Sequence, residues 1–350
     1  MIRSYAKENL DTMKSVLRLF FFCAVTCWSI TANGQSFNFI HDGINREYIY
    51  YEPASLSVNA PLVFVAHGYS GSAQDIRNYS GMNAIADQND FAVCYPQGTV
   101  DSSGDNFWNV GYSFHSGVTV DDIGFLESLA SYLQITYQLS SANTFFTGMS
   151  NGGEMCYLLA FDGSNVFKAF APVAGTVFPN GVIDNLFLSN LSIPFFITHG
   201  DNDNTTLYSG DQNDTFWGPY LSVDTLVDFW VNVNSLTDLV VDTFPNINNN
   251  NKITISHKYS SSVVDKEVWL YTHQSGHSWG DDGDMVIEQE IWNFFTKMSL
   301  NISAVVNEPS LKKNLINVVD ILGRQSTNKK NTLLLYIYDD GSVEKRIIFE

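Results

Sequence analysis

Short apolar runs alternate with amphipathic helical patterns from residue 61 to residue 298, and this alternation restricts the fold more than any other feature. Strand and helix in alternation predict an α/β fold with a mostly parallel, doubly wound sheet flanked by helices. The helical patterns cover 73–89, 120–138, 154–163, 222–234 and 284–298. The runs predicted as strands are apolar almost throughout, as expected for parallel strands covered on both faces: "PLVFVAHG", "FAVCYPQG", "TFFTGMS", "FKAFAPVAG", "IPFFITHGD" and "EVWLYTHQ".

Two segments outside this alternation are predicted to be β structure. "SFNFIHDG" and "REYIYYEP" come first and predict an antiparallel hairpin at one edge of the sheet. From about residue 303 the helical pattern stops, the charge balance shifts and three short strands are predicted, with Asp340-Gly341 as the turn between the last two. We therefore expect an α/β domain over 35–302 and a small all-β module over 303–350.

The first 34 residues have the pattern of a secretory signal peptide. A basic start precedes an apolar stretch from Leu19 to Ile30, and small residues follow. Cleavage is predicted between Gly34 and Gln35, and Met13 is a second candidate for the start of the chain. A membrane anchor is the alternative, but the apolar stretch is short for a span. We therefore expect a secreted or cell-surface protein without a stable membrane span.

The expected α/β domain is strongly acidic. Residues 35–302 hold 29 acidic and 7 basic residues, a net charge of −22, and the whole chain carries −19. A surface of this charge repels nucleic acid and anionic membranes. No nucleic-acid partner is expected, and a neutral substrate is favoured.

Two cysteines follow the signal peptide, in segments with different predicted structures. Cys94 lies in the strand-like "FAVCYPQG", and Cys156 lies in the helical pattern after Ser150. An exported protein permits a disulfide, but cysteines on apolar elements are more often buried thiols. We expect buried thiols, and the sequence leaves their pairing open.

The stretch "TGMSNGGE" supplies the main candidate for chemistry. Gly148-Met149-Ser150-Asn151-Gly152 fits G-x-S-x-G, a sharp strand-to-helix turn that holds a serine in strained geometry between small residues. The turn presents the Ser150 hydroxyl at the C-terminal edge of the sheet. It also places the Asn151 amide at a helix N-terminus, where it can stabilise an oxyanion. Ser150 is therefore the predicted nucleophile, and a simple glycine-rich turn is the alternative.

A serine nucleophile needs a base and an acid that orients the base. His277, in the glycine-flanked "SGHSWGDD", is favoured as the base over His257 and His273, which fall within or at the end of a strand. "FFITHGDNDNTT" offers two acids after another strand. Asp203 is preferred because it lies further into the loop, where its side chain can reach back to the histidine, and Asp201 is the alternative.

The rest of the expected site comes from loops after early strands. In "VFVAHGYSGSA", Gly68 permits a sharp turn, so that the backbone amide of Tyr69 can act as a second oxyanion donor. Trp108 and Trp279 are candidates for a substrate-binding wall, and either can instead belong to the core. The sequence has no zinc pattern and no complete calcium-ligand spacing, so no metal and no cofactor are expected.

Several of these motifs occur in one order along the chain: "HGY", "NFWNVG", "VDDIGFLESLASYL", "TGMSNGGEMCYLLA", "APVAG", "THGDND" and "GHSW". Together they resemble the polyhydroxybutyrate depolymerase and feruloyl esterase group of α/β-hydrolases over roughly residues 38–298. The resemblance implies a triad of Ser150, Asp203 and His277, with the Tyr69 and Asn151 amides as oxyanion donors. Two departures affect the pocket rim and the acid: Tyr69 stands where a cysteine is frequent, and "HGDND" replaces "HGT-x-D".

The C-terminal module has a resemblance of its own. "INVVDILGRQ" and "LLLYIYDDGSVEKRIIFE" resemble the C-terminal sorting domain of type IX secretion in Bacteroidetes. The resemblance implies that the type IX secretion machinery is a partner. A small substrate-binding β module is the alternative, and the absence of an aromatic platform in the sequence argues against it.

These features lead to one functional expectation and two alternatives. We expect a secreted serine carboxylic-ester hydrolase that acts through an acyl-enzyme on hydroxyalkanoate or feruloyl-polysaccharide esters. A serine peptidase on the same fold is one alternative, and the absence of a propeller or large cap domain argues against it. A non-catalytic surface binding protein is the other, and the complete set of triad residues argues against it.

Overall fold

The structure is a computed structural model that describes residues 35–178, 191–245, 252–280, 285–299, 315–320, 324–325, 333–338 and 343–347. The chain divides into two compact units, Met1–Ser299 and Leu300–Glu350, and each is described by itself. The expected signal peptide and the Asp340-Gly341 turn lie outside the described residues.

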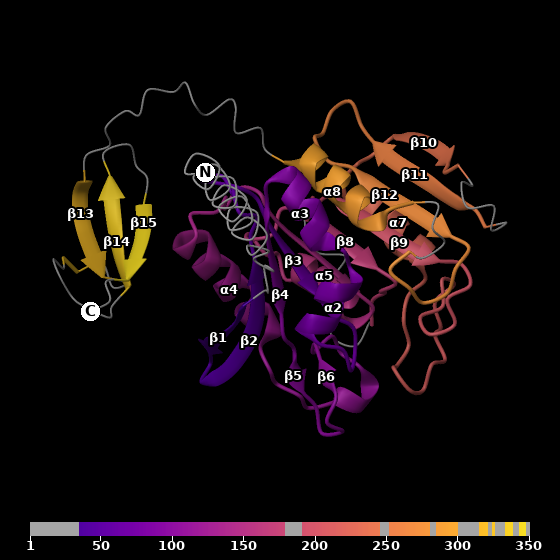
Figure 1. The fold of residues 1–350 in the computed structure, drawn as a ribbon, viewed down its shortest axis with the longest axis horizontal. Helices are drawn as coiled ribbons and strands as arrows, with labels where there is room; N and C mark the ends of the chain where they lie inside the picture. The colour runs from indigo at the N-terminus through magenta and orange to yellow at the C-terminus, as the bar shows by residue number, and fades with distance from the viewer. Residues whose placement is uncertain are drawn as a thin grey trace, which may run out of the picture. The chain divides into compact units, whose positions relative to one another are not determined.

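A ten-stranded sheet forms the centre of the larger unit (Figure 1). In order across the sheet, its strands are β1 (Gln35–His41), β2 (Ile44–Tyr51), β4 (Ala92–Pro96), β3 (Leu62–Ala66), β7 (Thr144–Met149), β8 (Phe170–Val173), β9 (Phe195–Gly200), β12 (Val268–His273), β11 (Thr254–Ser260) and β10 (Asp238–Thr243). The strands from β4 to β12 are parallel, and an antiparallel pair extends each edge. The predicted parallel strands and the predicted N-terminal hairpin are confirmed.

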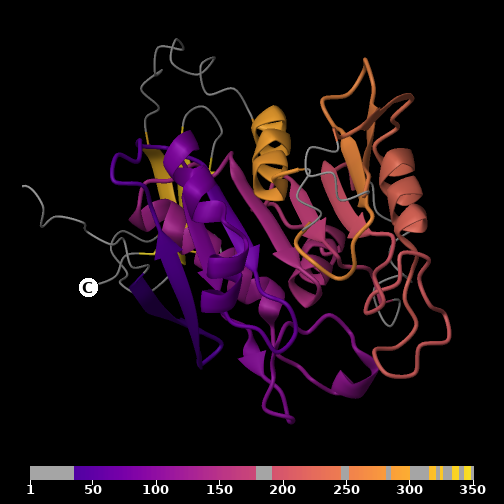
Figure 2. The same ribbon diagram turned by 45° about the vertical axis from the view of Figure 1, so that its right-hand side comes forward.

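Helices cover both faces of this sheet (Figures 1 and 2). Residues of β3 alternate between two apolar clusters, with Phe64 in one and Val63 and Val65 in the other, so the strand is apolar throughout. Within the described ranges, no helix is both long and apolar enough to cross a bilayer. One face carries α2 (Ala73–Tyr79), α3 (Met82–Asn89) and α8 (Ile287–Met298), and the other carries α4 (Asp122–Thr136), α5 (Asn151–Phe161) and α7 (Val223–Val233).

Some local features differ from the sequence prediction. The pattern over 73–89 predicts one helix, but Gly81, with a φ of +64°, separates α2 from α3. The edge strand β10 is exposed along its whole length and lacks the alternation that marks a half-buried strand. The hairpin of β5 (Thr99–Val100) and β6 (Asn106–Phe107), and the 3-10 turn η1 (Ser113–His115), are too short to give a periodic signal.

Two further predictions, for the cysteines and for the C-terminal strands, are confirmed within the described residues. Cys94 and Cys156 are both buried free thiols, because each packs in the apolar core beside the sheet. The smaller unit is an antiparallel sheet of β13 (Leu315–Asp320), β14 (Leu333–Tyr338) and β15 (Val343–Ile347). Its strands are the short runs that the sequence predicts after the α/β domain.

Candidate active site

Ser150 occupies a strained turn between β7 and α5. Its backbone has a φ of 53° and a ψ of −121°, a combination that residues other than glycine rarely adopt. A β-carbon added to Gly148 would lie 2.5 Å from the carbonyl oxygen of Gly152, and one added to Gly152 would lie 2.4 Å from that of Ala66. The turn therefore requires glycine at both positions, as the G-x-S-x-G pattern predicts.

Asn151 is the first residue of α5, so its backbone N–H is among the helical donors that have no acceptor within the helix. The side chain is engaged elsewhere. Asn151 Oδ1 accepts a hydrogen bond from Trp108 N at 2.7 Å, and Nδ2 donates to Trp108 O at 3.0 Å. The side chain thus joins the loop after β6 to the Ser150 turn, and the backbone amide is the group that can serve a ligand.

The strands that precede the other predicted residues end at the same edge of the sheet as β7. Ser150 N donates to Val173 O at 2.8 Å, and Asp201 N donates to His273 O at 3.0 Å. Val173 pairs with Thr198 between them, so the bonds form a row across the ends of β7, β8, β9 and β12. The loops after β7, β9 and β12 therefore leave the sheet at the same edge.

Asp203 and His277 meet at this edge. His277 Nδ1 and Asp203 Oδ2 are 2.7 Å apart, and Asp203 Oδ1 accepts hydrogen bonds from the amides of Thr205 and Thr206 at 2.8 and 2.9 Å. Burial opposes ionisation of Asp203, but the hydrogen bonds from His277 and Thr206 outweigh it and lower its pKa below the ordinary value. The carboxylate is therefore ionised at neutral pH and oriented toward the imidazole.

The alternatives for acid and base lie in other surroundings. Asp201 is exposed, and its Oδ1 accepts a hydrogen bond from Asn202 Nδ2 at 2.7 Å. His257 lies within β11. His273 is fully buried at the end of β12, and its Nδ1 contacts Ser275 Oγ. The structure thus pairs the preferred acid with the preferred base.

His199, a residue with only a weak sequence signal, lies against the acid at the end of β9. It is fully buried in β9, its Nε2 donates to Thr206 O at 2.7 Å, and the same nitrogen lies 3.4 Å from Asp203 Oδ2. Burial lowers the pKa of His199, so the ring is neutral. A histidine at the end of a strand and four residues before the acid is the only sequence signal for this role.

The turn at Gly68 and Tyr69 packs directly against Ser150. A β-carbon added to Gly68 would lie 3.3 Å from Ser150 Cβ. His67 fixes this turn: its Nε2 accepts a hydrogen bond from Gly98 N at 2.9 Å, so the proton is on Nδ1, which donates to Gly68 O at 2.7 Å. Burial lowers the pKa of His67 to about 4, and the ring keeps this neutral form. His67 therefore holds the Gly68 turn in place as well as filling the core.

Both tryptophans are buried, which corrects the expectation that they form a substrate-binding wall. Trp108 is fully buried, and its indole N–H donates to His67 O at 3.0 Å. Trp279 is 2% exposed and packs in the cluster that includes Trp292. A tryptophan in a loop can turn toward a cleft or toward the core, and here both large rings fill space in the core.

Glu154 is a buried acid that the sequence analysis missed. It lies in the first turns of α5, and its Oε2 accepts a hydrogen bond from Tyr112 Oη at 2.6 Å, while Asn151 Nδ2 lies 3.5 Å from the same oxygen. Burial raises its pKa to about 8, although both hydrogen bonds act in the opposite direction. The signal was present: Glu154 is the one charged residue in the otherwise apolar "GGEMCYLLAF".

Glu154→Gln is expected to stabilise the protein at pH 8. The folded pKa of about 8 exceeds the ordinary value of 4.5, so the folded state holds a proton that the unfolded state releases between these values. The free energy of unfolding therefore falls as pH rises through this window, and glutamine removes an effect on the order of 3 kcal/mol. Denaturant midpoints at pH 5 and pH 8 measure it, with Glu127→Gln on α4 as the control. An unchanged pH dependence in Glu154→Gln would contradict the assignment.

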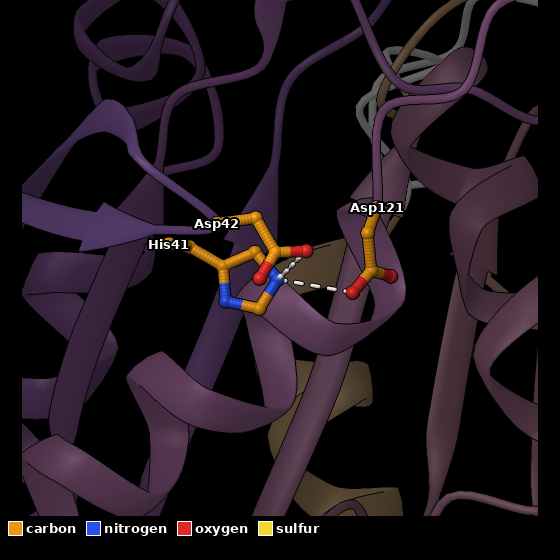
Figure 3. A group of neighbouring side chains, drawn as sticks. All are labelled: His41, Asp42 and Asp121. Carbon is orange, nitrogen blue, oxygen red and sulfur yellow. Dashed lines mark hydrogen bonds and ion pairs between the residues drawn. The ribbon is translucent and has the colours of Figure 1, made fainter.

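A second group of titratable side chains lies at the lateral edge of the sheet, where β1 ends beside the start of α4. His41, Asp42 and Asp121 bring their ligand atoms within 4.8 Å of one another (Figure 3). His41 Nε2 is 3.0 Å from Asp121 Oδ2 and 3.8 Å from Asp42 Oδ2, and Asp121 Oδ1 accepts a hydrogen bond from Gly124 N at the start of α4. His41 and Asp121 thus form an ion pair, and Asp121 also caps the start of α4.

The chain is similar in sequence to known ester hydrolases. Residues 46–186 match the model of the family described as Esterase PHB depolymerase. The chain is 28% identical over 155 residues to poly(3-hydroxyalkanoate) depolymerase C of Paucimonas lemoignei, which covers 43% of the chain and 36% of that protein. It is 29% identical over 136 residues to feruloyl esterase B of Thermothelomyces thermophilus, which covers 38% and 45%. The chain thus spans less than half the length of these curated relatives.

The fold is also found among solved structures. The acetyl xylan esterase from Aspergillus awamori superposes with a TM-score of 0.51 at 17% sequence identity, covering 75% of this chain and 100% of that one. At this identity the likeness concerns the fold. The chain therefore has the α/β-hydrolase fold, and the relatives it matches by sequence are carboxylic-ester hydrolases.

Proposed function

We propose that the chain is a secreted serine carboxylic-ester hydrolase. The observation that carries the proposal is the pairing of Asp203 with His277 at the sheet edge where the strained turn presents Ser150. An ionised, buried carboxylate that holds Nδ1 of an imidazole leaves Nε2 free to act as a general base. The similarity to depolymerases and esterases supports the same chemistry.

The reaction runs through an acyl-enzyme. His277 takes the Ser150 proton as Ser150 Oγ attacks the ester carbonyl, and the amides of Asn151 and Tyr69 hold the oxyanion. His277 then gives the proton to the leaving alcohol. Water, activated by the same base, releases the carboxylic acid and restores Ser150. Preformed oxyanion donors and a fixed imidazole lower the activation barrier, because they need no rearrangement at the moment of reaction.

The proposed substrates are hydroxyalkanoate esters and hydroxycinnamoyl esters of polysaccharides. The relatives' names support both, and the acidic charge of residues 35–302 favours uncharged esters over acidic polymers. Hydrolysis of methyl ferulate, hydroxybutyrate oligomers and acetylated sugars separates the classes. A fluorophosphonate probe should label Ser150, as read by peptide mass. A protein that neither hydrolyses any of these esters nor reacts with the probe would refute the proposal.

We propose further that residues 1–34 are a signal peptide, that 35–302 form the catalytic domain, and that 303–350 form a sorting domain read by the type IX secretion machinery. The antiparallel sheet of β13, β14 and β15 is compatible with a separate module of this kind. The intact mass of the exported protein tests both ends, because a mature chain that keeps either segment would contradict its assigned role.

A further inference from the structure

Four aromatic side chains from three loops gather beside the Ser150 turn, and we call Tyr69, Phe114, Phe216 and Trp217 the aromatic surface. The Tyr69 ring is 5.5 Å from Trp217 and 5.9 Å from Phe114, and Phe114 is 5.3 Å from Phe216. These separations are those of favourable aromatic pairs. Because Gly68 packs against Ser150, the surface begins next to the proposed nucleophile and extends outward from it.

Two of these rings are exposed to solvent. Phe216 is 63% exposed and Phe114 is 42% exposed, and they are the exposed phenylalanines among the described residues. Solvent-exposed apolar side chains that cluster together mark binding surfaces, whereas scattered ones need no explanation. The loop that follows Asp203 carries Phe216 and lies side by side with the loop that carries η1 and Phe114 (Figure 2).

The loop that carries Phe216 is held in place. Asp214 Oδ1 accepts hydrogen bonds from the amides of Phe216 and Trp217 at 2.8 and 2.7 Å, and Trp217 O accepts one from Ser113 N at 2.8 Å. Gly218 has a φ of +106°, and a β-carbon there would lie 2.5 Å from Ser113 Oγ. The backbone that carries these rings is therefore positioned before any ligand arrives, which lowers the entropic cost of binding.

Asp101 ties the aromatic surface to the turn beside Ser150. Its Oδ2 accepts a hydrogen bond from Tyr69 Oη at 2.7 Å and lies 3.0 Å from His115 Nε2, next to Phe114. Burial opposes ionisation of Asp101, but the hydrogen bonds from His115 and Tyr69 hold its pKa well below the ordinary value. One buried carboxylate thus fixes both the oxyanion turn and the η1 turn.

We infer that the aromatic surface binds a planar aromatic ring of the substrate, adjacent to the ester that Ser150 attacks. The inference rests on the proposed function, because it places the ring relative to the scissile bond. The exposed rings are phenylalanines, which offer stacking and no hydrogen bond. Two of the polar groups beside these rings are already engaged, since Asp214 Oδ1 serves backbone amides and Gln212 Nε2 donates to Tyr220 O. A sugar ring needs several hydrogen-bond partners for its hydroxyls, whereas a planar aromatic ring needs only the faces and edges of these rings.

The test compares methyl cinnamate, methyl butanoate and an acetylated methyl glycoside as substrates. In Phe216→Ala, the ratio of kcat/KM for methyl cinnamate to that for methyl butanoate should fall about 10-fold, and further in the double variant with Phe114→Ala. Phe216→Trp should keep the ratio, and Phe216→Leu should not. Ile135→Ala removes an apolar side chain on α4 that is more exposed than either phenylalanine, and it serves as the control.

Equal losses on all three esters, or none, would overturn the inference, as would a loss confined to the acetylated glycoside. Binding separates this failure from failure of the proposed function. If the protein hydrolyses no ester, calorimetric titration with methyl cinnamate still decides. Binding that weakens about 10-fold in Phe216→Ala supports the aromatic surface, and binding that is absent or unchanged in the variant overturns it.

Discussion

Ser150→Ala is expected to remove nearly all ester hydrolysis, with a loss in kcat on the order of 10⁶-fold if the serine is the nucleophile. The remaining groups, the two amides and the base, can then only assist direct attack by water. The substitution deletes one oxygen and leaves the β-carbon in place, so the strained turn with its φ of 53° changes little. The measurement is turnover of p-nitrophenyl butyrate, with circular dichroism to verify that the variant folds.

Ser235→Ala is the matched control for this variant. Ser235 follows α7, is exposed, and has a φ of 54°, so alanine there makes the same change at a similar positive φ away from the proposed site. It should keep wild-type turnover. A Ser150→Ala protein that folds and retains more than a small fraction of activity would refute the acyl-enzyme mechanism.

The sequence predicts those parts of the fold that depend on local chemistry. The central strands are recognisable because both of their faces are buried, which makes each run apolar throughout. The Ser150 turn is recognisable because the backbone leaves room for glycine alone at 148 and 152. Asp203 and His277 follow from the order of strands in an α/β sheet, since residues after parallel strands meet at one edge.

The parts that the sequence does not predict depend on contacts between distant segments. Asp101 joins Tyr69 to His115, and nothing local to any of the three indicates the others. Asn151 is predicted to act through its backbone amide, but its side chain also binds the backbone of the buried Trp108, which no local pattern indicates. Such networks have no periodicity, so a sequence pattern cannot reveal them.

Asp203→Asn is expected to lower kcat roughly 10³- to 10⁴-fold, the loss seen when a triad acid becomes an amide. The reason lies in the hydrogen bonds around Asp203. The amides of Thr205 and Thr206 both donate to Oδ1, so an asparagine must keep its oxygen there and turn its NH₂ toward His277 Nδ1. An NH₂ group at that position favours an unprotonated Nδ1 with the proton on Nε2, and Nε2 then cannot accept the Ser150 proton.

Asp201→Asn decides between the two acids, because it makes the same chemical change two residues away. Asp201 is exposed and contacts Asn202, so its amide should leave kcat close to the wild-type value. The tautomer argument also predicts that Asp203→Asn changes kcat far more than KM, since substrate contacts remain. Loss of activity in Asp201→Asn with retention in Asp203→Asn would assign the acid to Asp201 and would require the loop after β9 to rearrange in the active enzyme.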